Sequence, residues 1–187
     1  MHLTGLHLLL TYQCTSECDH CFVWGSPAQS GVMSQADIRE ILRQAVDTET
    51  ITSIYFEGGE PFLYYPSLLW AVQNAADLGF KTGIVTNGFW AVSEEDAFIA
   101  LQPFAGLISD LSISCDFFHW DETSFRLAEN AAAAAARLGI STGSISIARP
   151  ENASALNSTG QLPIGESKVM FRGRAAVKLA SLVPAKP

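Results

Sequence analysis

The chain has few basic residues, and this shortage excludes one class of partner. Lys and Arg number 11 against 19 Asp and Glu, which gives the 187 residues a formal net charge of −8. Proteins that hold nucleic acid bind its phosphates through a basic surface. We therefore expect no nucleic acid partner.

Long apolar runs and a basic start are also missing. No stretch approaches the about 18 uninterrupted apolar residues that indicate a membrane-spanning helix, and the start Met1-His-Leu-Thr-Gly lacks the basic residues of a signal peptide. We expect a cytoplasmic protein with no membrane partner. In such a protein four cysteines indicate metal or redox chemistry rather than a disulfide framework.

What the chain does have is enough apolar material for one substantial core. Apolar residues make up 48% of it and charged residues 16%. At this length, one hydrophobic core is the ordinary arrangement. We expect residues 1–187 to form a single domain.

Short apolar runs, typical of buried strands, recur along the chain. We expect strands over residues 6–12, 51–56, 82–86, 107–114 and 144–148, and a short sixth strand over 168–171. Between them lie helical patterns. Ser34-Gln-Ala-Asp37 and Ser93-Glu-Glu-Asp96 are capping boxes that predict the starts of two helices, and further helices are expected over 66–78 and 122–138.

Strands that alternate with helices favour an α/β fold. Consecutive strands then pair in parallel through right-handed crossovers, which gives either a barrel or an open doubly wound sheet. In barrels of this kind, sites lie at the carboxyl ends of the strands. The candidate motifs fall after four successive strands: the cysteines that begin at Cys14, Gly58 to Glu60, Asn87-Gly88, and Ser114 to Asp116.

Three cysteines lie in the short run Cys14-Thr-Ser-Glu-Cys18-Asp-His-Cys21. Each thiolate could ligate a different iron of a 4Fe-4S cube, and the fourth iron would stay open to a small molecule. Two other interpretations stay open. One is structural zinc with His20 as the fourth ligand, although adjacent side chains rarely converge on one metal. The other is a set of plain reduced thiols.

The two glycines after the second strand have two interpretations. Gly58 and Gly59 let the chain turn sharply and expose backbone groups to a ligand, for which Glu60 would supply an acceptor. The same residues also suit an ordinary turn between a strand and a helix.

Cys-x3-Cys-x2-Cys after a first strand, followed by Gly58-Gly59-Glu60-Pro61 after a second, resembles the radical S-adenosylmethionine (SAM) enzymes. The resemblance covers roughly residues 6–176. It implies a partial (β/α)6 barrel with parallel strands, and an enzyme whose cofactors are a 4Fe-4S cluster and SAM.

The resemblance also implies roles for the motifs. Cys14, Cys18 and Cys21 would ligate the cluster, and Gly58, Gly59 and Glu60 would bind the methionyl ammonium of SAM. In the family, an electron from the reduced cluster cleaves SAM to methionine and a 5'-deoxyadenosyl radical, which abstracts hydrogen from a substrate. Reduced flavodoxin or ferredoxin would be the electron donor.

Three further residues are candidates for contacts with SAM. Ser114 and Asp116 point to one face of an extended segment, where they could grip ribose hydroxyls as similar residues do in the family, while Cys115 points to the other face. Asn87 could close over SAM or substrate, although Asn-Gly is also a common turn dipeptide.

Arg172-Gly-Arg174-Ala resembles the Gly-Arg-Ala that ends the sixth strand in peptide-modifying members of the family. These arginines could bind a carboxylate or form a solvated pair. Such members commonly continue into a cysteine-rich extension, whereas no cysteine follows Arg174 here. The chain is thus expected to be either a minimal enzyme with one cluster or a C-terminally truncated product.

Three functions follow from these observations. The first is a radical SAM enzyme acting on a peptide or a small molecule. The second is a non-catalytic iron-sulfur protein that transfers electrons or senses redox state. The third is an inactive truncated paralogue.

Overall fold

A computed structural model describes residues 2–115, 122–147, 166–167 and 169–182 of the chain. The strands in these residues form one parallel sheet. Every strand pair is parallel, and the strands lie side by side in sequence order. They are β1 (Gly5–Thr11), β2 (Ser53–Gly58), β3 (Lys81–Thr86), β4 (Ile108–Ser114), β5 (Ser141–Ile147) and β6 (Glu166–Ser167). This arrangement confirms the predicted α/β fold, a partial (β/α)6 barrel.

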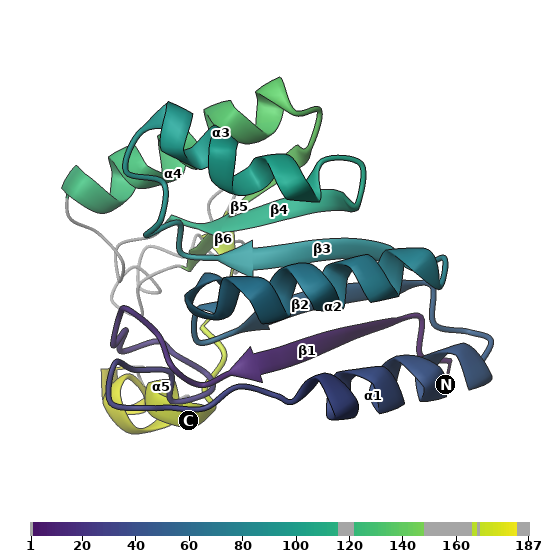
Figure 1. Cartoon of the computed structure of the whole chain (residues 1–187). Helices are drawn as coiled ribbons and strands as arrows, with labels where there is room; N and C mark the ends of the chain where they lie inside the picture. The colour runs from purple at the N-terminus through teal and green to yellow at the C-terminus, as the bar shows by residue number, and fades with distance from the viewer. Residues whose placement is uncertain (1, 116–121, 148–165, 168, 183–187) are drawn as a thin grey trace, which may run out of the picture.

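Of the five α-helices in the described residues, four cover one face of the sheet and the fifth lies elsewhere (Figure 1). The covering helices are α1 (Gln35–Asp47), α2 (Tyr65–Asp77), α3 (Glu94–Leu101) and α4 (Glu122–Arg137). The fifth, α5 (Gly173–Lys178), lies beside the loop that follows β1, at the end of the sheet to which the arrow of β1 points. Short 3-10 turns occupy Pro61–Tyr64, Gln102–Phe104 and Ala180–Leu182.

The two predicted helix starts are confirmed. Ser34 and Ser93 are N-caps, and the hydroxyl of each accepts a hydrogen bond of 3.1 Å from the backbone N–H three residues later. Side-chain oxygens at this position satisfy an amide that the helix itself leaves without an acceptor.

The two faces of the strands differ because successive side chains alternate. On β2, Ile54 and Phe56 are fully buried beneath the helices, whereas Tyr55 and Glu57 keep some exposure. The apolar residues on the helix-covered face join the inner faces of the helices in one core. Its fully buried members include Ile38, Ile54, Phe56, Leu68, Ile84, Leu101, Phe104 and Leu111.

The predicted sixth strand is wrong in position. β6 pairs Glu166 and Ser167 with the end of β5, whereas residues 169–171 form no strand. Their course differs because they lead into α5, whose first amides bind the loop after β1 instead of the sheet. The other five strands match their predictions to within three residues at each end that the structure describes.

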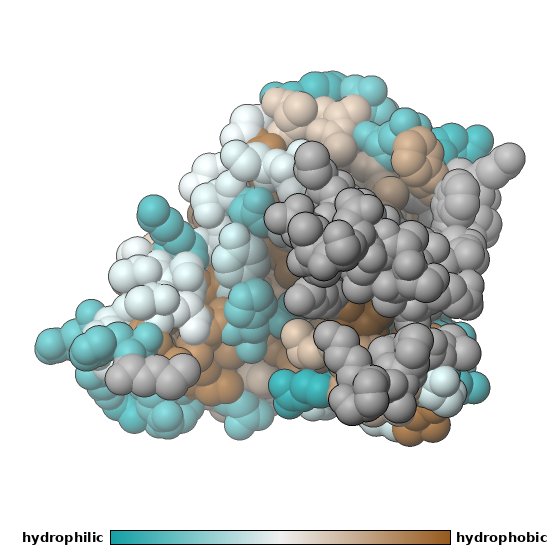
Figure 2. Space-filling model, turned by 180° about the vertical axis from the view of Figure 1, so that it is seen from behind, coloured by the Kyte–Doolittle hydropathy of each residue, from teal (hydrophilic) through white to brown (hydrophobic). Residues whose placement is uncertain are grey.

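Figure 2, turned by 180° from Figure 1, shows the opposite side of the molecule, where apolar residues (brown) lie next to pale and hydrophilic residues (white and teal). Among the described residues, no helix is long and apolar enough to cross a membrane.

Candidate functional site

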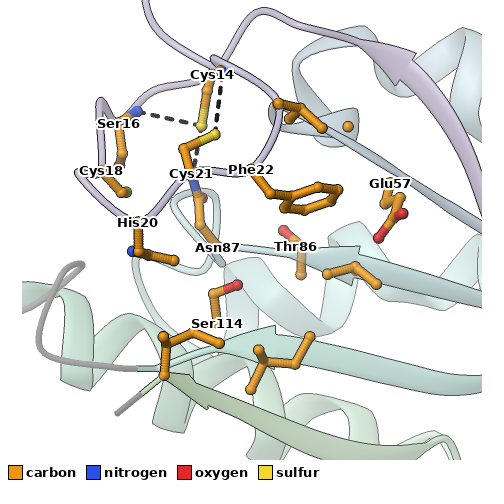
Figure 3. A pocket seen from close by; sticks show the side chains of 17 residues that line it. Cys14, Ser16, Cys18, His20, Cys21, Phe22, Glu57, Thr86, Asn87 and Ser114 are labelled. Atoms are coloured by element: carbon orange, nitrogen blue, oxygen red, sulfur yellow. Dashed lines mark hydrogen bonds between the residues drawn. The ribbon is translucent and has the colours of Figure 1, made fainter. Parts of the chain in front are cut away.

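A cavity of about 170 Å³ lies at the carboxyl ends of the strands. Five elements or loops contribute to it, and Figure 3 shows the cysteine-bearing loop above Asn87 and Ser114. The lining residues are Cys14, Ser16, Cys18, His20, Cys21, Phe22, Val23, Gly25, Glu57, Gly58, Gly59, Val85, Thr86, Asn87, Ser114, Ile145 and Ile147. The structure thus brings together all three predicted cysteines, both glycines, Asn87 and Ser114.

The loop that carries the cysteines, residues 12–26, is held by backbone hydrogen bonds. The Cys14 amide donates to the carbonyl of Ser26 at 3.1 Å, and the Cys21 amide donates to the carbonyl of Cys18, also at 3.1 Å. Two amides reach sulfur directly: Ser16 N lies 3.4 Å from Cys14 Sγ, and Gly25 N lies 3.2 Å from Cys21 Sγ. Such N–H groups stabilise a thiolate or a sulfur bound to metal.

Burial raises the pKa of the Cys14 thiol to about 11, although the Ser16 amide acts in the opposite direction. The thiolate is the form that ligates metal, so ligation of a cluster by Cys14 would release this proton.

The donor set fits a cluster better than one metal ion. In the described residues, no three His, Cys, Asp or Glu side chains are placed to hold a single ion. A 4Fe-4S cube puts each thiolate on a different iron, so its ligands need not converge. Gly25 lies next to two of the cysteines, since a Cβ there would stand 3.5 Å from Cys21 Sγ and 3.6 Å from the Cβ of Cys14. The missing side chain leaves space beside these two cysteines.

Gly58 and Gly59 are required by the close approach of the chain that follows β1. A Cβ on Gly58 would collide with the carbonyl of Thr11, and one on Gly59 with the carbonyl of Gln13. Gly58 also has φ +148, a region that favours glycine. The Gly59 amide donates to Thr11 O at 2.6 Å. Since both glycines also line the cavity, the tight turn and the pocket are formed by the same residues.

Glu60 lies behind the pocket and organises it. Its carboxylate is completely buried and accepts hydrogen bonds from the Phe62 amide at 3.0 Å, the Thr86 hydroxyl at 2.9 Å and the Asn87 amide at 2.7 Å. These bonds join the ends of β2 and β3. Direct binding of SAM by Glu60 stays a prediction.

Asn87 connects the end of β3 to the cysteine loop. Its Nδ2 donates to Thr15 Oγ1 at 2.9 Å and lies 3.6 Å from Cys14 Sγ, while its Oδ1 accepts from the Phe89 amide at 3.1 Å. The side chain therefore stabilises the turn and also faces the cavity.

The residues after β4 point to two different places. Ser114 lines the cavity beside the cysteines. Cys115 lines a separate cavity with Phe125 and Ala128 of α4, on the other face of the sheet. Asp116, predicted to act with Ser114, lies outside the described residues.

Glu57 is a pocket residue that sequence analysis missed. Its carboxylate lies 3.2 Å from Nδ1 of His7, and the His7 ring stacks on Tyr55 at 5.1 Å. Burial raises the pKa of Tyr55, and the nearby carboxylate of Asp110 adds to this shift. The alternation along β2 could have identified Glu57, because Phe56 between two polar residues marks the buried face.

The Gly-Arg-Ala segment contacts the cysteine loop from the far end of the chain. Arg174 is only 3% exposed, and its guanidinium donates to the carbonyls of Cys18 at 2.8 Å and Gly25 at 2.7 Å. The carboxylate of Glu17 lies 3.6 Å away. Arg172, by contrast, is exposed, so the two arginines do not form a solvated pair.

A partial barrel of parallel strands, with three cysteines on the loop after β1, defines an α/β protein with a candidate iron-sulfur site. Residues 8–156 match the model of the Radical SAM superfamily, and the chain belongs to this family. Its cofactors are a 4Fe-4S cluster and SAM, which fit the thiol set and the glycine-lined cavity.

Curated relatives match part of the chain. The putative peptide biosynthesis protein YydG of Bacillus subtilis is 31% identical over 120 residues, which are 64% of this chain and 38% of that protein. A probable GTP 3',8-cyclase of Saccharolobus islandicus is 32% identical over 88 residues, which are 46% of this chain and 28% of that protein. The chain thus covers well under half the length of each relative.

Solved structures share the fold at low sequence identity. The structure of anSMEcpe with bound AdoMet has a TM-score of 0.58 at 18% identity, covering 84% of this chain and 45% of that one. SuiB of Streptococcus suis bound to precursor peptide SuiA has a TM-score of 0.51 at 14% identity, covering 89% of this chain and 49% of that one.

Proposed function

We propose that the protein is a radical SAM enzyme that abstracts hydrogen from a peptide. The observation that carries the proposal is a pocket at the carboxyl ends of the strands. It contains three thiols on one loop, the two glycines after β2, and Asn87. Family membership supports the cofactor pair.

In this proposal, Cys14, Cys18 and Cys21 hold the cluster, whose bound form supplies the electron for reductive cleavage of SAM. Gly58 and Gly59 expose backbone next to the thiols, which leaves room for the methionyl end of SAM. Glu60 keeps that edge in place through its bonds to β3.

The other pocket residues orient the nucleoside end and exclude water. Ser114 offers a hydroxyl for a contact with the ribose of SAM. We propose that Asp116 binds the ribose together with Ser114. Val85, Ile145 and Ile147 add apolar side chains to the lining of the cavity. Such an apolar lining protects a reactive radical from solvent. A reduced flavodoxin or ferredoxin is the proposed electron donor.

A peptide suits the described pocket better than a nucleoside triphosphate such as GTP. The lining contains the carboxylate of Glu57 and neither Lys nor Arg, and the chain has a net charge of −8. Phosphates are bound by Arg, Lys or a metal ion. The similarity to a putative peptide biosynthesis protein also supports a peptide.

Formation of 5'-deoxyadenosine tests the enzyme activity. Anaerobically reconstituted and reduced protein is given SAM, with Cys18→Ala as the control. Product from the wild type alone supports radical SAM chemistry. An intact cluster that neither cleaves SAM nor binds it in calorimetry would favour the electron-transfer alternative, and failure to take up any cluster would favour an inactive paralogue.

The nucleotide alternative has its own test. GTP is added to the same reaction, and its consumption is followed by chromatography. We expect GTP to be recovered unchanged. Consumption that depends on SAM and on Cys18 would overturn the choice of a peptide while keeping the radical SAM assignment.

A further inference from the structure

The start of α5 lies directly against the loop that holds the cysteines. The amides of Arg174 and Ala175 both donate to the carbonyl of Cys21, at 2.9 and 3.3 Å. In Figure 1, α5 (yellow) lies beside the purple segment that follows β1. The two segments are far apart in sequence, since Arg174 and Cys18 are separated by 156 positions.

The guanidinium of Arg174 bridges two parts of the loop. Nη1 donates to the carbonyl of Cys18 at 2.8 Å, and Nη2 donates to the carbonyl of Gly25 at 2.7 Å. These carbonyls stand on either side of Cys21 in the sequence. A planar guanidinium with donors in a fixed fork sets the separation of the two acceptors, which a flexible ammonium cannot do.

Burial makes these contacts costly to remove. Arg174 is 3% exposed, and a buried charge is stable only when its donors are hydrogen-bonded or paired. Trp24 covers the guanidinium with its ring centroid 5.7 Å away, and Glu17 lies 3.6 Å from it. All of these partners lie within residues 17–25, so the side chain is committed to the cysteine loop.

Gly173 permits this close approach. Its φ is +54, and a Cβ added there would collide with the backbone carbonyl group of Phe22. Glycine is therefore required both by conformation and by space. Each residue of Gly173-Arg174-Ala175 therefore contacts the backbone of the cysteine loop.

We propose that Arg174 is a positioning residue that clasps the cysteine loop and determines how long a bound cluster is retained. The proposal rests on the proposed function, because it assumes that Cys14, Cys18 and Cys21 hold a cluster. By bridging Cys18 and Gly25, the guanidinium holds the loop in one shape, and the thiols keep their spacing before and after cluster uptake.

Hydrogen exchange on the cluster-free protein tests the clasp without any cofactor. Arg174→Ala is compared with the wild type and with Arg172→Ala, which removes the exposed arginine two residues away. We expect amide exchange at residues 14–26 to rise about tenfold or more in Arg174→Ala, the effect of losing hydrogen bonds from a charged donor. Exchange in β2 and β3 should stay unchanged. Equal loop exchange in all three proteins would overturn the proposal, and so would a uniform rise across the sheet.

Iron release tests the consequence for the cluster. The reconstituted proteins are mixed with an iron chelator, and the loss of cluster absorbance is timed. Arg174→Ala should release iron about tenfold faster than the wild type, Arg172→Ala at the wild-type rate, and Arg174→Lys in between, because Lys keeps the charge but not the fork. Unchanged release from Arg174→Ala would overturn the proposal.

Two results separate this inference from the proposed function. A wild type that takes up no cluster contradicts the proposed function, whereas the exchange experiment still decides on the clasp. If Arg174→Ala does not fold, Gly173→Ala replaces it in both experiments, because the added Cβ displaces α5 from Phe22 while the arginine is kept. Wild-type exchange and release in that variant would overturn the proposal.

Discussion

The two faces of the sheet are built from different residues. The helix-covered face is apolar and nearly closed to solvent, with Leu8, Ile54, Phe56, Ile84 and Leu111 among its buried residues. The opposite face carries polar side chains that keep some exposure, namely His7, Tyr55, Glu57, Asp110, Ser112 and Ser114. One face therefore supplies most of the burial that stabilises the fold, and the other is left for chemistry. Substitutions on the two faces should separate stability from function.

The largest effect on cluster binding and activity is expected when a cysteine of the pocket is compared with a cysteine on the helix-covered side of the sheet. Cys18→Ala removes a proposed cluster ligand from the pocket, and we expect complete loss of the cluster and of 5'-deoxyadenosine formation. Cys115→Ala, on the helix side against Phe125 and Ala128, should keep both. Iron content and product formation measure the difference. A Cys18→Ala protein that kept its cluster would remove the basis of the site assignment.

Neighbouring aromatic residues on β2 provide the next comparison. Phe56→Ala should lower the free energy of unfolding by about 3–5 kcal/mol, the usual cost of a large cavity in a core, because Phe56 is fully buried. Tyr55→Phe, on the other face, changes only a hydroxyl and should cost far less. Urea denaturation of both variants checks this order, and equal losses would contradict the division between the faces.

Alanine substitutions at two glycines should lower the free energy of unfolding by different amounts. Gly59→Ala forces a Cβ into the backbone carbonyl of Gln13, so we expect a loss of about 1–3 kcal/mol, the typical cost of overpacking. Gly143→Ala is the control, because its Cβ would stand at 3.4 Å from Ser112 Oγ, an ordinary contact. Thermal unfolding of the two variants measures the contrast, and a stable Gly59→Ala protein would show that the turn has room to adjust.

Glutamine substitutions at Glu60 and Glu57 should have smaller effects on stability. Glu60→Gln replaces an acceptor for buried donors with an amide and should cost about 1–3 kcal/mol, together with weaker SAM binding in calorimetry. Glu57→Gln should leave unfolding almost unchanged, because its partner His7 is largely exposed. The reverse order of stability would mean that Glu57, and not Glu60, organises the pocket.

The smallest effect is expected on the outer surface. Arg137 forms ion pairs with Glu94 and Glu95 at 2.9 and 3.3 Å, but all three side chains are exposed. Water and salt screen such pairs. Arg137→Ala should melt within experimental error of the wild type, and a clear drop would show that the contact between α3 and α4 depends on these charges.

Local patterns sufficed for most of the fold and for the centre of the site. Hydrophobic runs and capping boxes predicted five strands and the starts of α1 and α3, because these signals act between residues close in sequence. The cysteine loop and the double glycine could be placed together because parallel strands end at the same edge.

The remainder depends on contacts that no local pattern encodes. Glu60 meets Thr86 across 26 positions, and only the assembled sheet turns its carboxylate away from the cavity. The sixth strand was misplaced because residues 169–171 are apolar enough for a strand, but α5 is held by the cysteine loop instead. The same long-range contact explains why the burial of Arg174 could not be predicted.

The sequential order of the strands also sets the order in which the site is synthesised. Each strand lies beside the one that precedes it, so the sheet can grow by adding one strand at a time as the polypeptide emerges. The three cysteines are synthesised first, the cavity-lining residues Ile145 and Ile147 more than a hundred residues later, and Arg174 after that. A nascent chain therefore presents its cysteine loop before the arginine that fastens it has been translated.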